Sequence, residues 1–554
     1  MKQIIADLLK REVKLHREEL LNFVEIPPKD EMGDFAFPCF ILAKTLKKNP
    51  VAIAQDLAEK LRKELPRELS NVDFSGGYVN FFLDKKILAR DVLKKVKEKD
   101  FGTNDSFRGK NFVIDMSSPN IAKPFGIGHL RSTIIGNSIS EIAKANGYNV
   151  TKINYFGDWG TQFGKIILAY KKWGSEAKLR KDSVGHLQEL YVKISSDDKY
   201  DDAAREEFRK LEQGDSENAG LWKKFRKLSV SKFDEIYKIL GVTFDVTSGE
   251  SEYNDKMDSV IEELKKKKLL KRDDGALIVD LKKDRLGVAL IQKSDGTSLY
   301  ATRDLAAVKE RKKKYKFDKM VYEVGQEQSL HFKQVFKILE KLGYSWVKDC
   351  VHVSHGLYLD KDGKKLSTRK GRIIYMKDIL DEVVEKAKKK LGEESLSKKV
   401  LEERARKIAL AAIFYGDLKN SRENNIVFDA DKFLSFEGDT GPYLLYSYAR
   451  AGSIVRKVKN RKKFQILDLK DSEIKLLKKI SSFGEIVKRA NDFLAPHLIA
   501  NFAFELSQIF NEFYHSCPVL GSSEEEFRLE LVDAFRVTLK KALGLLGIEV
   551  LEEM

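Results

Sequence analysis

The spacing of hydrophobic residues changes along the chain, and the changes predict three kinds of domain. Residues 1–105 combine helical spacing, as in Ile4–Val24, with a strand pair near Val72–Leu83. Residues 106–400 alternate apolar runs with amphipathic stretches, a pattern typical of a parallel sheet with crossover helices. Residues 401–554 keep helical spacing. We therefore expect a multidomain chain with a small α+β domain, a Rossmann-type α/β domain and an all-α domain.

The connection after the apolar run Phe112–Ile114 carries the clearest sign of chemistry. Gly126 and Gly128 lack a Cβ and let the backbone approach a ligand. His129 then falls in the first turn of the predicted helix, where free N–H groups and the helix dipole attract phosphate. Lys123 adds a positive charge. The string predicts a site for nucleotide phosphates, and its alternative is a glycine-containing turn in another α/β domain.

A second strand is predicted at Val150–Phe156, and together with the first strand it forms a β-α-β unit. The crossover places the first loop at the carboxyl edge of a parallel sheet. The loop Gly157–Gly164, which reads G-D-W-G-T-Q-F-G, follows the second strand. We expect it to form another edge of the site, and its alternative is a tight turn packed by Trp159.

Residues 170–288 are charge-rich and mainly helical, and they end in a predicted strand at Ala276–Leu281. We expect them to form an insertion between the two halves of the α/β domain. Beyond it, Val288–Gln292 and Ser298–Tyr300 flank Asp295-Gly296, a pair that favours a type I′ hairpin turn.

Tyr300 and Asp304 share one face of the next helix if that helix begins near Tyr300. An aromatic ring and a carboxylate suit a guanidinium, which is planar, always charged and best held by a carboxylate. The alternative is a surface aromatic beside a local Arg303–Asp304 charge pair.

Two further segments combine positive charge with other functional residue types. A turn at Asp362-Gly363 leads into Lys364–Gly371, which reads K-K-L-S-T-R-K-G; alone it can equally be a solvated basic loop.

In the C-terminal region, tyrosines lie among basic residues, which suits unpaired bases that stack while phosphates are neutralised. The alternative is a helical bundle whose tyrosines pack internally. The last helix places a stripe of apolar residues on one face: Leu529, Val532, Phe535, Leu539, Leu543 and Leu546.

The composition indicates which kind of protein this is and which kind of binding partner it has. The chain has 554 residues and a formal net charge of +17, which favours a polyanionic partner. Lysine clusters such as Lys265–Lys268 are nevertheless also typical of solvated helix faces. The three cysteines, Cys39, Cys350 and Cys517, are far apart and suggest neither a disulfide framework nor a thiolate zinc site. The first residues are too charged for a signal peptide, and no apolar run is long enough to span a membrane, so we expect a cytoplasmic protein.

The quoted strings resemble class I aminoacyl-tRNA synthetases in their arginyl form. The family's His-x-Gly-His signature corresponds to Gly126, Gly128 and His129, preceded by Ser118-Pro119-Asn120-Ile121-Ala122-Lys123, with Gly126 in place of the first histidine. The second signature, Lys-Met-Ser-Lys-Ser, matches at Lys365 and Ser367, and Thr368 replaces its second lysine. Gly33–Pro38 and Gly76–Phe82 resemble the family's N-terminal domain, which implies contact with the outer corner of a tRNA.

The resemblance implies an arginine–tRNA ligase that forms an arginyl-adenylate from ATP and then esterifies the terminal adenosine of tRNA(Arg). ATP would be held by Lys123, Gly126, Gly128 and His129, with magnesium carried by the nucleotide and no protein-bound metal. Charge on the phosphates would be stabilised by His129, Lys123, Lys365, Ser367, Arg369 and Lys370. Arginine would be held by Asp115, Asn120, Tyr300, Asp304 and Gln328, and tRNA contacts would include Tyr443, Tyr446 and Arg450. A monomer is expected.

Two alternatives remain at this point. One is a synthetase for a different amino acid, which Tyr300, Asp304 and Gln328 argue against. The other is a non-catalytic tRNA-binding relative, which the departures at Gly126 and Thr368 keep open.

Overall fold

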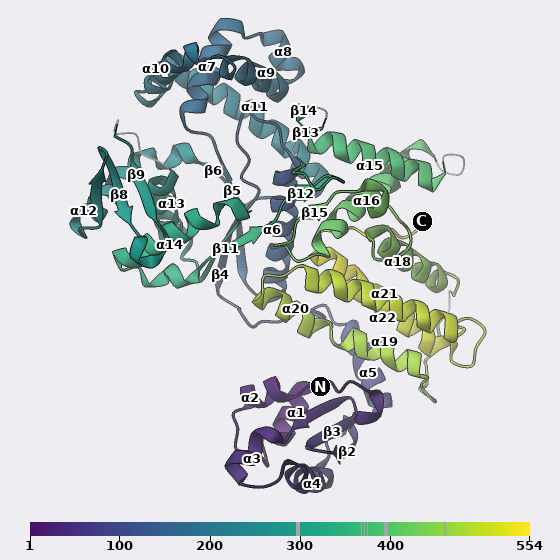
Figure 1. The fold of residues 1–554 in the computed structure, drawn as a ribbon. Helices are drawn as coiled ribbons and strands as arrows, with labels where there is room; N and C mark the ends of the chain where they lie inside the picture. Colours follow the sequence, from purple (N-terminus) through teal and green to yellow (C-terminus); the bar gives the residue numbers. More distant parts are fainter. Residues whose placement is uncertain (295–299, 367, 370–371, 374, 393–396, 459–460) are drawn as a thin grey trace. The chain divides into compact units, whose positions relative to one another are not determined.

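The structure of the chain, a computed structural model, describes residues 1–294, 300–366, 368–369, 372–373, 375–392, 397–458 and 461–554. The chain divides into two compact units (Figure 1). The first consists of Met1–Phe101, Ile454–Ser482 and Gln508–Thr538, and the second of Gly102–Ser453, Phe483–Ser507 and Leu539–Met554. None of the helices in the described part of the chain is long and apolar enough to cross a membrane.

The first unit begins with a three-stranded antiparallel sheet of order β1-β3-β2. The predicted strand pair near Val72–Leu83 is confirmed by β2 and β3. The sheet and the helices around it are α1 (Lys2–Leu9), α2 (Arg17–Phe23), η1 (Asp30–Met32), β1 (Phe35–Pro38), α3 (Phe40–Leu46), α4 (Pro50–Leu61), η2 (Arg62–Glu64), β2 (Leu69–Ser75), β3 (Tyr78–Leu83) and α5 (Lys85–Val96).

The single helix predicted over Ile4–Val24 was wrong, because the structure has two helices there. Val13 is buried in the break between them. The backbone N–H of His16 donates to the Glu19 carboxylate at 2.9 Å, and this capping bond begins α2. Apolar spacing continues across the break, so periodicity alone did not reveal it.

Residues from the C-terminal region complete the first unit. They belong to α19 (Asp471–Ser481) and to parts of α18 (Gly441–Arg456), α21 (His497–Ser516) and α22 (Glu525–Leu545). Here the Phe510 and Phe535 rings stack with centroids 3.9 Å apart, and Arg528 Nε lies 2.8 Å from Glu473 Oε1 in a buried ion pair. The six apolar residues of the predicted α22 stripe are all buried.

The second unit is built on a five-stranded parallel sheet of order β11-β10-β4-β5-β6. Its strands are β4 (Asn111–Asp115), β5 (Asn149–Phe156), β6 (Val246–Gly249), β10 (Lys319–Gly325) and β11 (Cys350–His355). From β4 the chain crosses to β5 and β6 on one side, and β10 and β11 lie on the other side. This is a doubly wound sheet with a reversal of strand order between β4 and β10.

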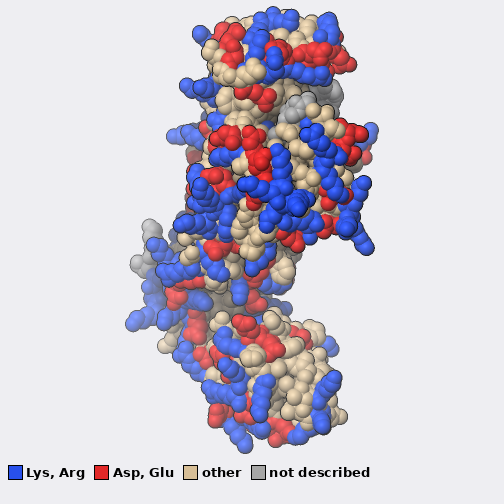
Figure 2. All heavy atoms as spheres, turned by 90° about the vertical axis from the view of Figure 1, so that its left-hand side faces the viewer, with Lys and Arg blue, Asp and Glu red and all other residues tan. Residues whose placement is uncertain are grey.

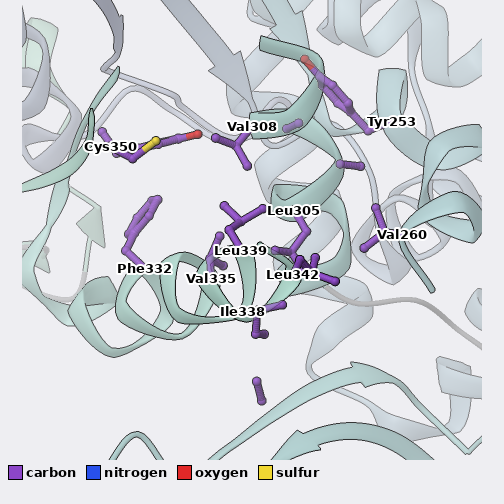
Figure 3. Close-up of a cluster of buried hydrophobic side chains, with 14 of the residues drawn as sticks. Tyr253, Val260, Leu305, Val308, Phe332, Val335, Ile338, Leu339, Leu342 and Cys350 are labelled. Atoms are coloured by element: carbon purple, nitrogen blue, oxygen red, sulfur yellow. The ribbon is translucent and has the colours of Figure 1, made fainter. Parts of the chain in front are cut away.

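Helices cover both faces of this sheet (Figure 1). α6 (Ile127–Ala145) packs on β4, β5 and β10, while α13 (Tyr300–Tyr315) and α14 (Ser329–Leu342) lie on the other side. Figure 3 shows the core that joins α13 and α14, in which Leu305 and Val308 face Val335 and Leu339. This packing fixes the start of α13 and the end of β10, which both reach the candidate site.

The segment expected as an insertion is mostly helical but also contains part of the sheet. Its helices are the end of α7 (Thr161–Trp173), α8 (Glu176–Lys181), α9 (Ser183–Ser195), η3 (Asp198–Tyr200), α10 (Asp201–Glu212), α11 (Ser216–Leu240), η4 (Glu250–Lys256) and α12 (Met257–Lys266). β6 lies within residues 170–288 and pairs with β5 in the main sheet. The polar sequence of β6, Val-Thr-Ser-Gly, gave no apolar run to predict it.

A separate antiparallel sheet of order β7-β8-β9 follows, made of β7 (Leu270–Asp273), β8 (Ala276–Asp280) and β9 (Val288–Gln292), with η5 (Lys282–Asp284) between β8 and β9. β8 confirms the strand predicted near Ala276–Leu281. β9 pairs with β8, and Tyr300 begins α13, so the prediction that Tyr300 belongs to a strand was wrong. The other residues of that predicted strand, 298–299, lie outside the described residues. The predicted turn at Asp295-Gly296 lies outside the described residues.

The rest of the second unit is helical apart from short strand pairs. Its elements are η6 (Gln326–Gln328), η7 (Ser345–Asp349), β12 (Tyr358–Leu359), β13 (Thr368–Arg369), β14 (Arg372–Ile373), α15 (Met376–Leu391), α16 (Lys398–Leu418), β15 (Ile426–Val427), α17 (Ala430–Phe433), α20 (Phe483–Asp492) and the remaining parts of α18, α21 and α22. β12 pairs in parallel with β15, and β13 pairs with β14.

Candidate active site

The carboxyl ends of the parallel strands carry most of the residues that the sequence singled out. β4 leads into the loop with Asn120 and Lys123, β5 into Gly157, and β10 into Gln328. α13 runs back from this same edge and begins with Tyr300. In doubly wound sheets, ligands bind in the crevice outside the carboxyl ends at the point where strand order reverses. That point lies here between β4 and β10.

The loop between β4 and α6 is held in a conformation that residues with a Cβ rarely adopt. Ser117, Ser118 and Ala122 have φ angles of 71°, 45° and 58°, each at a cost of roughly 1–3 kcal/mol. α11 braces the loop, because Ser229 Oγ accepts a hydrogen bond from the Ala122 N–H at 2.9 Å and the Tyr237 hydroxyl lies 2.8 Å from Ser117 Oγ. The surrounding structure therefore fixes the loop.

His129 lies at the third position of α6, and its ring is oriented by the helix itself. The Gly126 N–H donates to His129 Nδ1 at 3.2 Å. Burial lowers the pKa of His129 to about 4, and the charges of Lys123 and His355 act in the same direction. The neutral ring therefore carries its proton on Nε2 and can donate it beside the amides of the helix N-terminus.

Lys123 lies close to this helix end and also contacts the expected insertion. Its Nζ is 5.3 Å from the centroid of the Tyr191 ring, which belongs to α9. A cation over an aromatic face is stabilised by about 0.5–2 kcal/mol. The Lys123 charge also lowers the pKa of His129, so the two side chains share one site.

Asn120 is held against the loop after β5. The Ile121 N–H donates to the Gly157 carbonyl at 3.2 Å, and a Cβ built on Gly157 would lie 2.0 Å from Asn120 Oδ1. Only glycine at position 157 leaves room for the Asn120 amide. The two predicted loops therefore meet at Asn120.

The loop after β5 is anchored by the buried carboxylate of Asp158. It accepts from Arg226 Nε at 2.8 Å and from the Ser251 N–H at 2.9 Å. Trp159 packs edge-to-face on Trp222 with ring centroids 5.6 Å apart, which is the packing that the tight-turn alternative predicts. The loop thus ties α11 and the residues after β6 to the sheet edge.

The carboxyl edge of the sheet is also reached from α13, by Tyr300 and Asp304, and from η6, by Gln328. Asp304 Oδ2 lies 2.6 Å from His331 Nε2, which orients the carboxylate. The Tyr300 side chain is exposed, and the Arg303 guanidinium lies 5.9 Å from its ring centroid. The local Arg303–Asp304 pair of the alternative interpretation is not among the ion pairs of the described residues, since Arg303 faces Glu250.

Glu250 was missed by sequence reasoning, although it is the most unusual acid of the site. It follows β6, it lies 3.5 Å from Arg303 Nη1, and its Oε2 is buried without a hydrogen-bond partner among the described residues. Burial raises the pKa of Glu250 to about 8 against the opposing charge of Arg303, and Asp304 and Asp158 raise it further. The hydroxyl of Tyr155 in β5 is also buried without a partner in the described chain. Its pKa is raised by burial and then by Asp304 and Glu250.

Glu250, Asp304 and Tyr155 therefore form an acidic cluster with two carboxyl groups and an unpaired hydroxyl, and Arg303 lies beside Glu250. Such a cluster suits a cation that can donate several hydrogen bonds. The sequence offered no signal for Glu250, because the strand that precedes it, β6, has no apolar run.

Asp115 lies at the end of β4 but already binds a guanidinium of the chain itself. Arg311 Nη2 lies 2.8 Å from Asp115 Oδ2, and Ser118 Oγ donates to Asp115 Oδ1 at 2.7 Å. Arg311 also lies over the Tyr155 and Tyr322 rings, 4.9 and 5.5 Å from their centroids. Asp115 is thus at the base of the site, where it holds Arg311.

The basic loop is only partly described. A tight turn closes at Gly363, whose N–H donates to the Asp360 carbonyl at 3.1 Å. Lys365 Nζ lies 3.2 Å from Glu327 Oε1, beside the end of β10. Arg369 lies in β13, and Ser367 and Lys370 lie outside the described residues.

The residues expected to contact RNA lie on α18. Tyr446 is exposed, and Tyr443 and Arg450 are half-buried. Tyr443 packs edge-to-face on Phe504 with centroids 5.8 Å apart, and Tyr448 is buried. The structure therefore divides these tyrosines between packing and exposure. Figure 2 shows many Lys and Arg side chains, with Asp and Glu among them, on the face to which α12 belongs. Lys265–Lys268, at the end of α12, are exposed.

Three models of protein families match the chain in sequence. Residues 1–83 match the arginyl tRNA synthetase N-terminal domain, residues 91–430 the catalytic domain of class I (R) tRNA synthetases, and residues 444–554 the DALR anticodon binding domain. The match to the catalytic model includes every strand of the five-stranded sheet.

Known proteins agree with these matches over the whole chain. An arginine–tRNA ligase of Clostridium perfringens is 45% identical, with all of both chains covered, and one of Clostridium botulinum is 44% identical with the same coverage. The solved arginyl-tRNA synthetase of Thermus thermophilus is 26% identical with a TM-score of 0.83, covering 100% of this chain and 99% of that one. Sequence and fold agree from end to end, and the chain belongs to the class I arginyl-tRNA synthetase family.

Proposed function

We propose that the chain joins L-arginine to the 3′-terminal adenosine of tRNA(Arg): the arginine carboxylate displaces pyrophosphate from ATP to give arginyl-adenylate, and the adenosine hydroxyl then displaces AMP. One observation carries the proposal beyond family membership: the acidic cluster of Glu250, Asp304 and Tyr155 lies at the same sheet edge as the N-terminus of α6, and we infer that the arginine pocket forms there. The pocket suits a guanidinium, and the helix end suits phosphates.

The nucleotide is placed along the α6 side of the edge. The N–H groups after Gly126, the proton on His129 Nε2 and the ammonium of Lys123 converge on its phosphates. These donors stabilise the charge that develops as the arginine carboxylate attacks the α-phosphate and pyrophosphate leaves. The second signature adds to this stabilisation of the phosphate charge through Lys365, Ser367, Arg369 and Lys370. Magnesium bound to the phosphates of ATP would offset their remaining charge.

Arginine is placed with its guanidinium in the acidic pocket. The carboxylates of Glu250 and Asp304 accept its N–H groups, Tyr300 covers it, and Asn120 and Gln328 hold the amino-acid end. Asp115 contributes from a distance: its own oxygens hold Arg311, while burial and then the charge of Asp304 raise its pKa. An amino acid without the guanidinium leaves Glu250 Oε2 and the Tyr155 hydroxyl buried without a hydrogen-bond partner, which disfavours it strongly.

The tRNA is placed on the exposed parts of the C-terminal helices, with Tyr446 available for stacking on a base and Arg450 and Tyr443 beside it. The N-terminal domain, residues 1–105, contacts the outer corner of the same tRNA. Residues 106–400 form the catalytic domain, and residues 401–554 bind the anticodon. We further propose that the chain acts as a monomer in the cytoplasm.

Arginine binding is expected to release close to one proton at about pH 7. In the free protein the pKa of Glu250 is raised to about 8, so its carboxyl group is mostly protonated there. A bound guanidinium stabilises the carboxylate and lowers this pKa. Affinity for arginine should therefore rise by up to about tenfold per unit between pH 6 and 8 and level off above this range.

Calorimetry in two buffers with different heats of ionisation measures the released proton directly. Glu250→Gln is the matched control and should release none. Proton uptake by the wild-type chain, or equal affinity for arginine at pH 6 and 8, would contradict the proposed binding of the guanidinium beside Glu250.

Citrulline tests the proposed substrate class. It has the length of arginine but is neutral, because a carbonyl oxygen replaces one guanidinium nitrogen. We expect kcat/KM for charging with citrulline to be about 10⁴-fold or more below that for arginine, since two acids would lose their cation. A difference below about tenfold would mean that charge is not what the pocket recognises.

A further inference from the structure

His355 lies at the carboxyl edge of the sheet, outside the residues that the family signatures mark. It ends β11 and is paired with Gly325 at the end of β10. A Cβ built on Gly325 would lie 3.8 Å from His355 Nε2. The charge of His355 lowers the pKa of His129 on α6 and contributes to lowering that of Glu327, the partner of Lys365. His355 therefore lies near enough to His129 and Glu327 for its charge to act on both.

The ring of His355 is oriented by a buried acid. His355 Nδ1 lies 2.8 Å from Glu323 Oε1, and both side chains are buried. Burial opposes the charge on His355, but the Glu323 carboxylate outweighs it, so the pKa of His355 is raised. Arg131 on α6 lowers this pKa, and Asp417 on α16 raises it. When the ring is protonated, it donates Nδ1–H to Glu323 and has Nε2–H left for a second acceptor.

The position of the first signature histidine is open in this chain. Gly126 has an ordinary extended backbone, with φ −88° and ψ 171°, and no atom of the described residues lies within 4 Å of a Cβ built on it. A side chain at position 126 would therefore fit without strain. The signature has lost one of its two imidazoles, while a different imidazole stands at the same sheet edge.

We propose that His355 supplies the second imidazole of the phosphate site and does the work that the first signature histidine does in relatives that carry it. The inference rests on the proposed function. His355 Nε2–H donates to a phosphate oxygen of ATP, while Glu323 holds Nδ1 and keeps the ring aimed at the edge. The contact strengthens as pyrophosphate leaves, because negative charge then collects on its oxygens. No bond to His355 forms or breaks.

A rescue experiment separates this role from a purely structural one. His355→Asn should lower kcat for charging tRNA with arginine by about 100-fold, with the KM for arginine unchanged. Adding Gly126→His to that variant should restore at least about tenfold, because the new imidazole enters the phosphate site from α6. It cannot refill the place of His355 against Glu323, so a structural role predicts no rescue.

His352→Asn is the matched control. His352 lies on the same strand, its ring stacks on Phe332 with centroids 4.6 Å apart, and its Nε2 lies 3.1 Å from the Val324 carbonyl oxygen. This variant should charge tRNA at the wild-type rate.

Two results would overturn the proposal: His355→Asn with kcat within about threefold of wild type, or a loss that Gly126→His does not repair. If thermal melting shows that His355→Asn is unfolded, His355→Asn combined with Glu323→Gln removes the buried unpaired charge and is judged by the same two criteria. A wild-type chain that charges no tRNA would instead refute the proposed function.

Discussion

Changing His129 to glutamine is expected to lower kcat for charging tRNA with arginine by about 100- to 1,000-fold while stability is preserved. Gln at the third helical position can accept the same hydrogen bond from the Gly126 N–H that His129 Nδ1 accepts now. The substitution therefore keeps the helix cap and replaces the imidazole Nε2–H that faces the phosphates with an amide N–H in a different position.

His129→Ala is the informative comparison for this prediction. It should lose activity to the same extent and also lose about 1 kcal/mol of stability, because the capping bond disappears. Steady-state charging and thermal melting measure the two effects separately, and tRNA binding should be unchanged in both variants. A His129→Gln chain that keeps more than about a third of the wild-type kcat would show that α6 is not the phosphate site.

Changing Asp304 to asparagine is expected to reduce kcat/KM for arginine by a factor of about 30 to 1,000, equivalent to about 2–4 kcal/mol. The substitution keeps the shape of the side chain but removes one of two carboxylates that face the guanidinium. The KM for ATP should not change, because the phosphates lie on the α6 side of the edge. The rate of charging should therefore fall more at a low concentration of arginine than at a saturating one.

Glu310→Gln offers a control on the same helix. Glu310 is half-buried and lies 4.0 Å from Lys256, away from the pocket, so its substitution should leave charging unchanged. Equal effects of the two substitutions would mean that Asp304 acts through the stability of α13 rather than through arginine.

Local chemistry made part of the site predictable. The apolar run of β4, the two glycines and His129 form a contiguous string, so the phosphate side could be inferred without the fold. Tyr300 and Asp304 needed only the helical period. These features depend on neighbours in sequence, and sequence patterns report neighbours well.

Other parts depended on contacts between distant segments. Glu250 follows a strand of four residues with little apolar character, and its burial against Asp304 and Tyr155 arises only when the sheet assembles. Asp115 was expected to meet the substrate, but the fold brings Arg311 to it from the end of α13. The break between α1 and α2 likewise depends on a capping bond that apolar spacing does not reveal. Burial and pairing of charges are tertiary properties, and a single sequence does not specify them.

Aminoacylation of total tRNA with each of the twenty amino acids in turn, with ATP and magnesium, is the most direct test of the whole account. Charging with arginine alone is the predicted result, and it would show that Gly126 and Thr368 are compatible with activity. Charging with a different amino acid would contradict the acidic pocket. A chain that binds tRNA but charges it with none of the twenty would contradict the proposed reaction and leave a tRNA-binding protein with the fold of a synthetase.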